Sequence, residues 1–479
     1  MPPKPDIKIQ LIQLFEEWVS EKAKSIDTVH AAGSERKYFR IKSDNKIAIG
    51  VFNFDHAENE AFISFSKTFS RLNFNTPKIF AKELNKHIYL IEDLGSKDLF
   101  SRVIKEGQKL SEATIAIYKK SLKALLNFQT QAVDLIDFSK CTPRNKLDQQ
   151  SLLWDLNYFK YYFLKTQKIS FDEQLLENDF KTFTNYLLEA DQKYFVYRDF
   201  QSRNILIQHD EPFFIDYQGA RKGPLQYDVA SLLFQVKANL SNEVKKELLD
   251  YYIGLLNSND TINTASFKKY YHPYALIRLC QVLGAYGFRG LIEKKPHFIQ
   301  SIPFAIKSLK NLLPEIKMEI EIPELMKVLK AVSNLQFPQV NQSRDGLTVH
   351  LKSFAYKAGI PNDFSGHGEG FVFDCRSLPN PGRLKEYKHL SGLNQEVIDY
   401  LDNFVEIDSF LKNVINIIKP AVTKFQQRNF TDLSINFGCT GGQHRSVYMT
   451  EAINKFLITN FKVNIELEHT QKTNWPMSN

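Results

Sequence analysis

The sequence predicts a two-lobed α+β domain followed by a smaller α/β domain, and three observations carry this prediction. Residues 6–25 have the apolar spacing of an amphipathic helix and are followed by alternating, strand-like segments. Aromatic-rich helical segments then dominate to about residue 330, and beyond a polar break strands alternate with helices, which is typical of an α/β unit. With 479 residues, the chain is long enough for two or three compact units.

The boundaries follow from where these patterns change. The small lobe is predicted over residues 1–95, with strands inside 30–53 and at 87–91, and the helical large lobe over 96–330. Residues 331–345 lose the helical period and become polar, so we interpret them as a linker. The smaller domain is predicted over 346–479, with strands at 347–353, 370–374 and 433–437 and helices over about 394–427 and 445–459.

Composition limits the class of protein. The chain is 43% hydrophobic and 24% charged, and it has no run of 18 consecutive apolar residues, so we expect no membrane span. The N-terminus lacks the apolar core of a signal peptide, and the four cysteines are widely spaced, which together favour a cytoplasmic protein. The net charge of +8 favours anionic partners. From Val340 onward 15 Lys and Arg stand against 14 Asp and Glu, so about +7 of the excess lies earlier in the chain.

The segment 195–207 carries the first chemical motif. Asp199 and Asn204 are separated by four residues, and a second apolar strand at 212–215 ends at Asp216. Phosphoryl transfer needs a carboxylate that orients the attacking hydroxyl and oxygen ligands that hold Mg²⁺. Asp199 fits the first role, and Asn204 and Asp216 fit the second. A D-x4-N pattern alone indicates no more than a loop with satisfied polar side chains, but the hairpin, Asp216 and an upstream nucleotide hinge at 90–95 favour a kinase-type centre.

Three segments here resemble the aminoglycoside phosphotransferase-like superfamily, and within it the N-acetylmuramate and N-acetylglucosamine kinases that phosphorylate the anomeric position. They are Gly33–Arg40, Tyr197–Asn204 and Ile215–Ala220. The resemblance spans roughly residues 6–330 and implies a protein-kinase-like fold that uses ATP and Mg²⁺. It implies Asp199 as the catalytic base, Asn204 and Asp216 as metal ligands, and Arg36, Lys37, Glu92 and Leu94 as nucleotide-binding residues.

Two positions depart from the family pattern. Tyr197 stands where the family has a scaffold His, and Gly50 stands where a protein kinase carries its phosphate-pairing Lys. The positive excess of this region favours a neutral or anionic acceptor over a polycationic one. Arg36, Lys37 or Lys46 could supply the missing positive charge. Glu58 or Glu60 could be the acidic partner of that charge, but we interpret both as solvated residues on a helix face. Asp228 is expected to anchor the catalytic loop.

A strand, a glycine turn and a helix follow one another near the C-terminus. Residues 433–437 alternate like a strand, and the turn Gly438–Ser446 leads into a helix with apolar stripes. Such a turn exposes main-chain N–H groups at a helix N-terminus, which attracts phosphate, and His444 and Arg445 can add charge-assisted bonds. A plain tight turn capped by Ser446 is the alternative.

Cys439 and Arg445 also have the C-x5-R spacing of cysteine phosphatases, in which a thiolate attacks a phosphoester. Gly438 replaces the His that is common before that cysteine, and the sequence shows no separate general-acid loop. A buried, unreactive thiol under a binding loop is therefore favoured over a phosphatase.

The loop closely resembles the signature of the C-terminal domain of the RNase adapter protein RapZ, and residues 353–359 and 373–381 support the match. The resemblance spans about 347–475 and implies binding of an amino-sugar phosphate, glucosamine-6-phosphate, and a contribution to small-RNA binding. A G-x4-G-K-[ST] nucleotide-binding domain is absent, and the tail at 464–475 lacks the basic run that binds RNA. The implied phosphate contacts are Thr440, Gly441, Gly442, His444, Arg445 and Ser446, with Arg376 and Asn380 as weaker candidates.

These patterns together predict an ATP-dependent amino-sugar kinase of cell-wall recycling whose C-terminal domain binds a sugar phosphate. The alternative is a regulatory adapter that senses an amino-sugar phosphate and binds RNA or protein, with the kinase unit as a non-catalytic scaffold.

Overall fold

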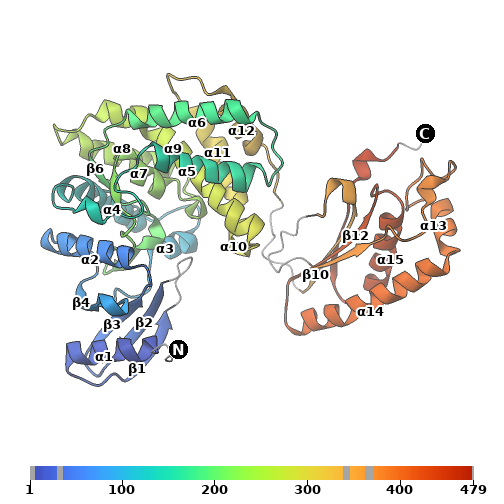
Figure 1. Cartoon of the computed structure of the whole chain (residues 1–479), viewed down its shortest axis with the longest axis horizontal. Coiled ribbons are helices and arrows are strands. Elements are labelled where there is room, and N and C mark those ends of the chain that lie inside the picture. Colours follow the sequence, from blue (N-terminus) through green and yellow to red (C-terminus); the bar gives the residue numbers. More distant parts are fainter. Residues whose placement is uncertain (1–5, 30–35, 338–345, 362–369, 477–479) are drawn as a thin grey trace. The chain divides into compact units, whose positions relative to one another are not determined.

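The computed structural model describes residues 6–29, 36–337, 346–361 and 370–476. The chain divides into two compact units (Figure 1). The first is Met1–Phe288 with Ser301–Gln336, and the second is Arg289–Gln300 with Phe337–Asn479. The Gly33–Glu35 part of the predicted phosphate-side turn and residues 338–345 of the predicted linker lie outside the described residues. The predicted linker begins too early, because helix α12 continues to Ser333.

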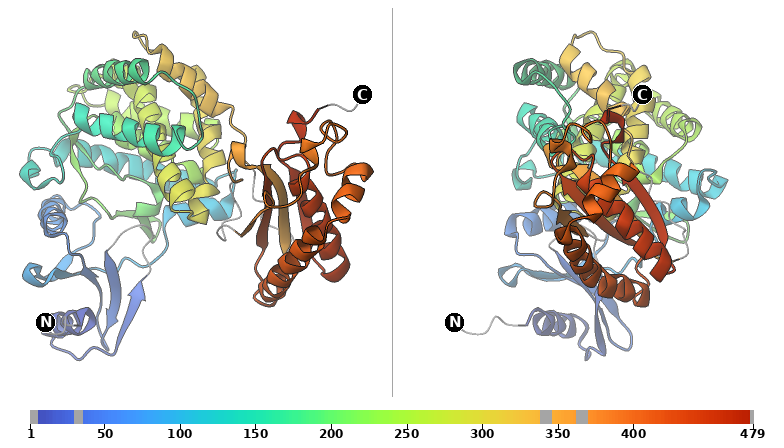
Figure 2. Two further views of the ribbon diagram at one scale, coloured as in Figure 1. Left: turned by 45° about the vertical axis from the view of Figure 1, so that its right-hand side comes forward. Right: turned by 90° about the vertical axis from the view of Figure 1, so that its right-hand side faces the viewer.

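The small lobe is a five-stranded antiparallel sheet in the order β1-β2-β3-β5-β4, with helices α1 and α2 beside it (Figure 2). The predicted helix over 6–25 is shorter than expected: Asp6 caps its start, and Ser20 ends it in the left-handed conformation at φ 56°. The strand β4 was not predicted, because its residues have no alternating burial. The elements are α1 Ile7–Val19, β1 Ser25–Val29, β2 Lys37–Lys42, β3 Ile47–Phe52, α2 His56–Arg71, β4 Ile79–Glu83 and β5 Ile88–Ile91.

The two faces of this sheet have different partners. Leu11 and Phe15 of α1 pack against alternate strand residues, among them Ile41. Gly50 lies on the same face, because a Cβ there would come within 3.0 Å of Leu11 and 3.1 Å of Ile41. Phe62 of α2 stacks on Tyr89 of β5 with ring centroids 5.4 Å apart, so α2 covers the opposite face.

The large lobe is mostly helical, with two short antiparallel strand pairs beside the predicted catalytic loop. Among the described residues, the stretch Thr264–Ile292 is long and apolar enough to span a membrane by length and composition, but 56% of its apolar window is buried, as in a core helix. The elements are α3 Leu99–Glu106, α4 Glu112–Gln131, α5 Gln149–Phe159, α6 Glu173–Leu188, β6 Tyr194–Val196, β7 Ile205–Gln208, β8 Glu211–Phe214, β9 Arg221–Gly223, α7 Gln226–Leu233, α8 Asn242–Asn257, α9 Thr264–Tyr286, α11 Ile302–Leu312 and α12 Pro323–Ser333.

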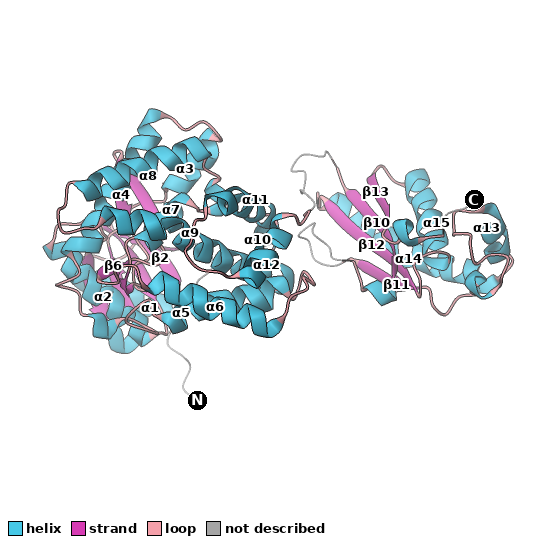
Figure 3. Ribbon diagram, turned by 90° about the horizontal axis from the view of Figure 1, so that it is seen from above, coloured by secondary structure: helices cyan, strands magenta, loops and turns pink. Residues whose placement is uncertain are grey.

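The second unit is built on a parallel four-stranded sheet in the order β11-β12-β10-β13, with α15 packed on β10 and β12 (Figure 3). The predicted α/β class is therefore confirmed. Strand β13 was missed, although Ile465 and Leu467 alternate with polar residues and gave a signal for it. The elements are α10 Pro296–Ile299, β10 Thr348–Ala355, β11 Phe371–Asp374, α13 Gln395–Asp402, α14 Val405–Gln427, β12 Asp432–Cys439, α15 Arg445–Asn460 and β13 Asn464–His469.

Because α5 packs closely on α9, we expect alanine substitutions at two helical glycines to change the stability in opposite directions. A Cβ at Gly284 would lie 2.7 Å from the Phe159 main-chain nitrogen, so we expect Gly284→Ala to destabilise the first unit by about 1–3 kcal/mol. At Gly254 of α8 nothing lies within 4 Å, so Gly254→Ala should stabilise by roughly 0.5–1 kcal/mol. Urea unfolding of the two variants measures both changes, and equal effects would contradict this packing.

Candidate functional site

The catalytic loop after β6 is held by one buried carboxylate. The main-chain N–H groups of Tyr197 and Arg198 donate to Asp228, at 2.6 and 2.9 Å. Arg198 has a φ of +77°, a conformation that these bonds and its ion pair with Asp155 maintain. Burial raises the pKa of Asp228 to about 7, while the two N–H groups act in the opposite direction. Asp228 therefore anchors this loop through hydrogen bonds, as the sequence predicted.

The three predicted chemical residues lie together behind this anchor. The Asn204 amide nitrogen donates to the main-chain oxygen of Asp199 at 2.9 Å and lies 3.3 Å from a carboxylate oxygen of Asp216. Asp216 has a φ of +71°, which turns the chain directly after β8. Burial, and then the charge of Asp199, raise the pKa of Asp216. The carboxylates of Asp199 and Asp216 are therefore close enough to repel each other, and a cation between them would stabilise the site.

Tyr197, at the position of the family's scaffold His, makes a hydrogen bond to the segment that carries Asp216. Its hydroxyl donates to the main-chain oxygen of Ile215 at 2.7 Å. Ile215 directly precedes Asp216, so this bond fixes the main chain that presents the carboxylate. Tyr197 therefore connects the loop that carries Asp199 to the segment that carries Asp216.

Arg36 supplies positive charge to the site. Its guanidinium is 4% exposed, binds Glu58 at 2.7 Å and lies 3.9 Å from Asp216. Lys37, the other predicted phosphate contact, is exposed at the start of β2. The interpretation of Glu58 as a solvated helix residue is wrong, because its carboxylate is the partner of Arg36.

The absence of a lysine at position 50 has a structural reason. Gly50 faces Leu11 of α1, on the side of the sheet away from Tyr89 and α2. A side chain at position 50 would therefore point away from α2, so the comparison of Gly50 with the kinase lysine was wrong. Glu60, the alternative partner on α2, binds Lys140 at 3.0 Å instead.

The hinge after β5 has main-chain groups available for a nucleotide base. The Glu92 N–H donates to the Lys78 main-chain oxygen at 2.9 Å, and the Glu92 carboxylate accepts from the Lys78 N–H at 3.2 Å. Within the described part of the chain, the Glu92 carbonyl and the Leu94 N–H have no protein hydrogen bond. Arg40 closes the hinge from β2 with two bonds to Asp93, at 2.6 and 2.9 Å.

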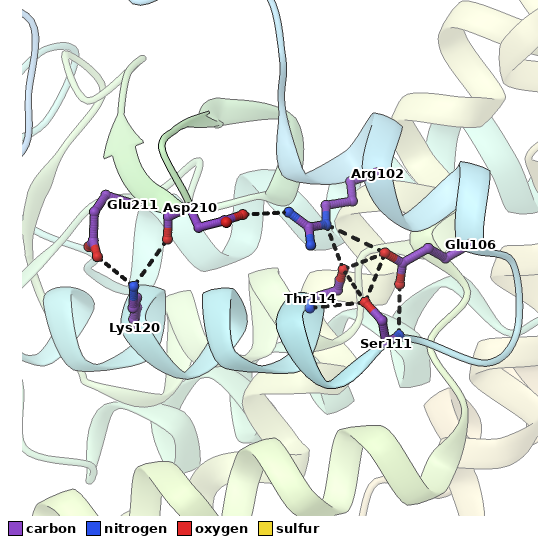
Figure 4. A network of polar contacts seen from close by, with 7 residues as sticks. All are labelled: Arg102, Glu106, Ser111, Thr114, Lys120, Asp210 and Glu211. Atoms are coloured by element: carbon purple, nitrogen blue, oxygen red, sulfur yellow. Dashed lines mark hydrogen bonds and ion pairs between the residues drawn. The ribbon is translucent and has the colours of Figure 1, made fainter.

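Ion pairs anchor the β7–β8 hairpin, which connects Asn204 to Asp216, onto helices α3 and α4 (Figure 4). Arg102 binds Asp210 at 2.9 Å, and Lys120 donates to the Asp210 main-chain oxygen at 3.1 Å and to Glu211 at 2.5 Å. Glu106 holds the other side of Arg102. The turn of the hairpin is therefore tied to two helices of the large lobe.

In the second unit, the turn between β12 and α15 brings the predicted anion-binding residues into one loop, but it uses several of their side chains internally. His444 hydrogen-bonds the Tyr387 main-chain oxygen at 2.9 Å, and burial lowers its pKa. Thr440 and Gly441 remain exposed. Anion contacts would therefore come mainly from main-chain N–H groups and Thr440.

The remaining side chains of this loop also have partners inside the protein. Arg445 donates to the main-chain oxygens of Arg376 and Leu378, at 2.7 and 3.0 Å. Ser446 lies 3.1 Å from the sulfur of Cys439, which is 3% exposed. Arg445 is thus turned toward the chain rather than toward a phosphoester, which argues against the phosphatase alternative. Its Nε is buried without a partner among the described residues.

The sheet order, helical lobe and catalytic loop define a protein-kinase-like fold of the aminoglycoside phosphotransferase type. Residues 28–261 match the model of the phosphotransferase enzyme family, and residues 347–473 match that of the RapZ C-terminal domain. The two matches fall on separate parts of the chain, and neither extends over half of it.

Curated relatives are named nucleotide-binding proteins. One from Thermosipho melanesiensis is 34% identical over 33% of this chain and 58% of its own length. One from Fervidobacterium nodosum is 28% identical over 49% of this chain and 85% of its own length. The chain thus covers little more than half of the first relative.

Two solved structures are similar to the phosphotransferase part. The aminoglycoside phosphotransferase APH(2'')-Ib with bound ADP has a TM-score of 0.42 at 12% identity, over 64% of this chain and 96% of that chain. Choline kinase from Cryptosporidium parvum has a TM-score of 0.44 at 12% identity, over 68% of this chain and 98% of that chain.

The residues fit a magnesium–nucleotide site by their chemistry. Asp216 and Asn204 offer carboxylate and amide oxygens, which Mg²⁺ prefers, and the raised pKa of Asp216 shows that its negative charge lacks full compensation. The described residues contain no group of three or more His, Cys, Asp and Glu suited to a metal ion, so a site here would rest on this mixed set.

Asp228 gives the catalytic loop a pH dependence that can be measured. Its folded pKa of about 7 lies above the ordinary 3.8, so protonation favours the folded state. That contribution is complete below about pH 4 and is lost as pH rises through about 7.

Asp228→Asn puts an amide N–H against a main-chain N–H and should cost about 1–3 kcal/mol of stability. We expect the stability difference between wild type and this variant to shrink from about pH 5 to about pH 8. Chemical unfolding across this range measures it, with the exposed Asp250→Asn as control. A difference that does not vary with pH would contradict the elevated pKa.

Proposed function

We propose that the first unit is a Mg-ATP-dependent phosphotransferase that phosphorylates a hydroxyl group of a small molecule. The convergence of Asp199, Asn204 and Asp216 on one site, with the Arg36–Glu58 pair beside it, carries this proposal. A scaffold without activity would have no need to keep all of these groups in place.

Each group has a role in this proposal. Asp199 orients the acceptor hydroxyl and receives its proton, while Asn204 and Asp216 hold Mg²⁺, which neutralises charge on the phosphates when bound. Arg36 meets a phosphate oxygen, as a guanidinium does well in a buried setting. The main chain at Glu92 and Leu94 meets the adenine. The exposed Lys37 contributes less than the sequence indicated.

We infer that the acceptor is an amino sugar, N-acetylmuramate or N-acetylglucosamine, recovered from the cell wall in the cytoplasm. The charge around the site supports a neutral or anionic acceptor. The positive charge of Arg203 acts on Asp216, and burial followed by that same charge lowers the pKa of Lys237. Two neighbouring cations near the catalytic carboxylates would repel a polycationic aminoglycoside.

The C-terminal domain is proposed to bind a sugar phosphate at the loop 440–446. Support comes from the match to the RapZ C-terminal domain and from the turn that presents main-chain N–H groups at the start of α15. The product of the kinase unit and the ligand of this domain would then share the same chemistry.

A regulatory adapter is the second candidate function, favoured by the RapZ-type domain itself. In that case the domain senses an amino-sugar phosphate and passes the signal to an RNA or protein. Strand β13 carries Glu466 and Glu468 on the C-terminal segment, where an RNA-binding protein would need positive charge. Protein is therefore the better supported partner of the two.

Replacing the proposed base tests the kinase. We expect wild-type protein with ATP and N-acetylmuramate or N-acetylglucosamine to give a sugar-phosphate signal in phosphorus NMR, whose position identifies the attachment site. Asp199→Asn should lower the rate by about 10²–10⁴. The exposed Asp191→Asn serves as control and should keep full activity. No transfer to any sugar of a broad panel, despite nucleotide binding, would refute the kinase proposal.

Two adjacent glycines test the C-terminal loop. Gly442 has a φ of +68°, and a Cβ there would lie 2.9 Å from the Ala355 main-chain nitrogen and 2.7 Å from Gln471. Gly441 has nothing within 4 Å. In calorimetric titration of the full chain with glucosamine-6-phosphate, Gly442→Ala should weaken binding at least about tenfold, and Gly441→Ala little. Equal loss in both variants would contradict the loop geometry. Salt-sensitive RNA affinity in a parallel titration would favour the adapter as an RNA binder.

A further inference from the structure

A groove lies against the hinge and the strand that leads to Asp216. It is a hollow of about 710 Å³, within the range of small-molecule sites. A second hollow of about 250 Å³ shares the wall formed by Asn73, Phe74 and Asn75. We call the larger hollow the back groove; it is lined by Ser66, Lys67, Ser70, Arg71, residues 73–80, Glu92 and Phe213.

The lining of the back groove combines positive charge with aromatic surface. Lys67, Arg71 and Lys78 are exposed, and none of them has an ion-pair partner within the described ranges. The one carboxylate in the lining, Glu92, already accepts the Lys78 N–H at 3.2 Å. Phe80 adds an aromatic wall. Unpaired cations beside aromatic rings suit a ligand with phosphate groups and a planar ring.

The groove walls connect directly to the catalytic segment. The Asn75 main-chain oxygen accepts the Phe214 N–H at 2.8 Å, and the Asn75 amide donates to the Pro212 oxygen at 3.1 Å. On the other side of Asp216, the Tyr217 hydroxyl lies 2.6 Å from the hydroxyl of Ser66. The groove therefore contacts the chain both before and after the metal-binding carboxylate.

The hinge gives a second connection. The side chain of Glu92 lines the groove, while its main-chain carbonyl belongs to the proposed adenine contact. A ligand that moves Lys78 or Glu92 changes the position of that carbonyl. The catalytic residues Asp199, Asn204 and Asp216 themselves do not line the groove.

From these contacts we propose that the back groove is an effector site for a nucleotide-like ligand, one with a planar ring and phosphate groups, and that its occupancy shifts the segment carrying Asp216. This site is separate from both the kinase centre and the C-terminal loop. Its binding step does not depend on the kinase being active.

Trp18 provides a reporter for binding. Its ring stacks on Phe80 with centroids 4.2 Å apart and an interplanar angle of 8°. The probe is UDP, which has a planar base and two phosphates, added to the full chain in which Trp154→Phe and Trp475→Phe leave Trp18 as the one tryptophan. The same titration of Arg36→Gln, which removes the proposed phosphate contact of the kinase site, should give the same change in fluorescence. We expect a saturable change in Trp18 fluorescence, and a flat titration would overturn the proposal.

Charge reversal assigns the signal to the groove. Arg71→Glu and Lys78→Glu should each weaken UDP binding at least about tenfold, because each replaces an unpaired cation with an anion. The exposed Lys181→Glu, outside the groove, is the matched control and should leave the affinity unchanged. If both groove variants bind as wild type does, the site lies elsewhere and the proposal fails, whether or not the kinase is active.

Hydrogen exchange tests the coupling. UDP should change the exchange of the amides at 213–217 in wild type and should not do so in Arg71→Glu. A UDP-induced fluorescence change without any change at 213–217 would overturn the effector role.

Discussion

The proposed catalytic centre depends on a buried carboxylate that binds two consecutive main-chain N–H groups. Asp228 holds the chain at Tyr197 and Arg198, and these bonds determine where Asp199 leaves the strand. Burying a carboxylate is costly, and the raised pKa of Asp228 records that the N–H groups compensate for only part of the lost hydration. The position of Asp199 therefore depends on a carboxylate whose burial the surrounding core must stabilise.

The two units would meet phosphate in chemically different ways. The first unit would use a side chain, the buried Arg36, whose charge Glu58 compensates. The second would use main-chain donors, while His444 and Arg445 make hydrogen bonds inside the protein. A buried guanidinium offers a directional, charge-assisted bond to a phosphate oxygen, whereas a loop of main-chain donors surrounds its ligand. This difference agrees with the proposed roles of catalysis in one unit and recognition in the other.

Most of the fold followed from periodicity, since α1 and the strands that face it carry regular apolar spacing. The motif residues Asp199, Asn204 and Asp216 were also found from spacing, because their separation along the chain is fixed by one loop and one hairpin. The role of Glu58 could not be predicted, because its pairing with Arg36 joins residues far apart in sequence. The face of the sheet on which Gly50 lies could not be predicted, because a shift of one residue in strand register moves every side chain to the opposite face. The internal bonds of Arg445 likewise required the position of residues 376–378 in space.

Because the C-terminal loop would bind its ligand through main-chain donors, the pH dependence of binding would come mainly from the ligand. Amide N–H groups do not titrate, and burial lowers the pKa of His444, which favours its neutral form. A phosphomonoester, in contrast, takes up its second proton near about pH 6. The loop would therefore distinguish the dianion from the monoanion mainly through the ionisation of the ligand itself.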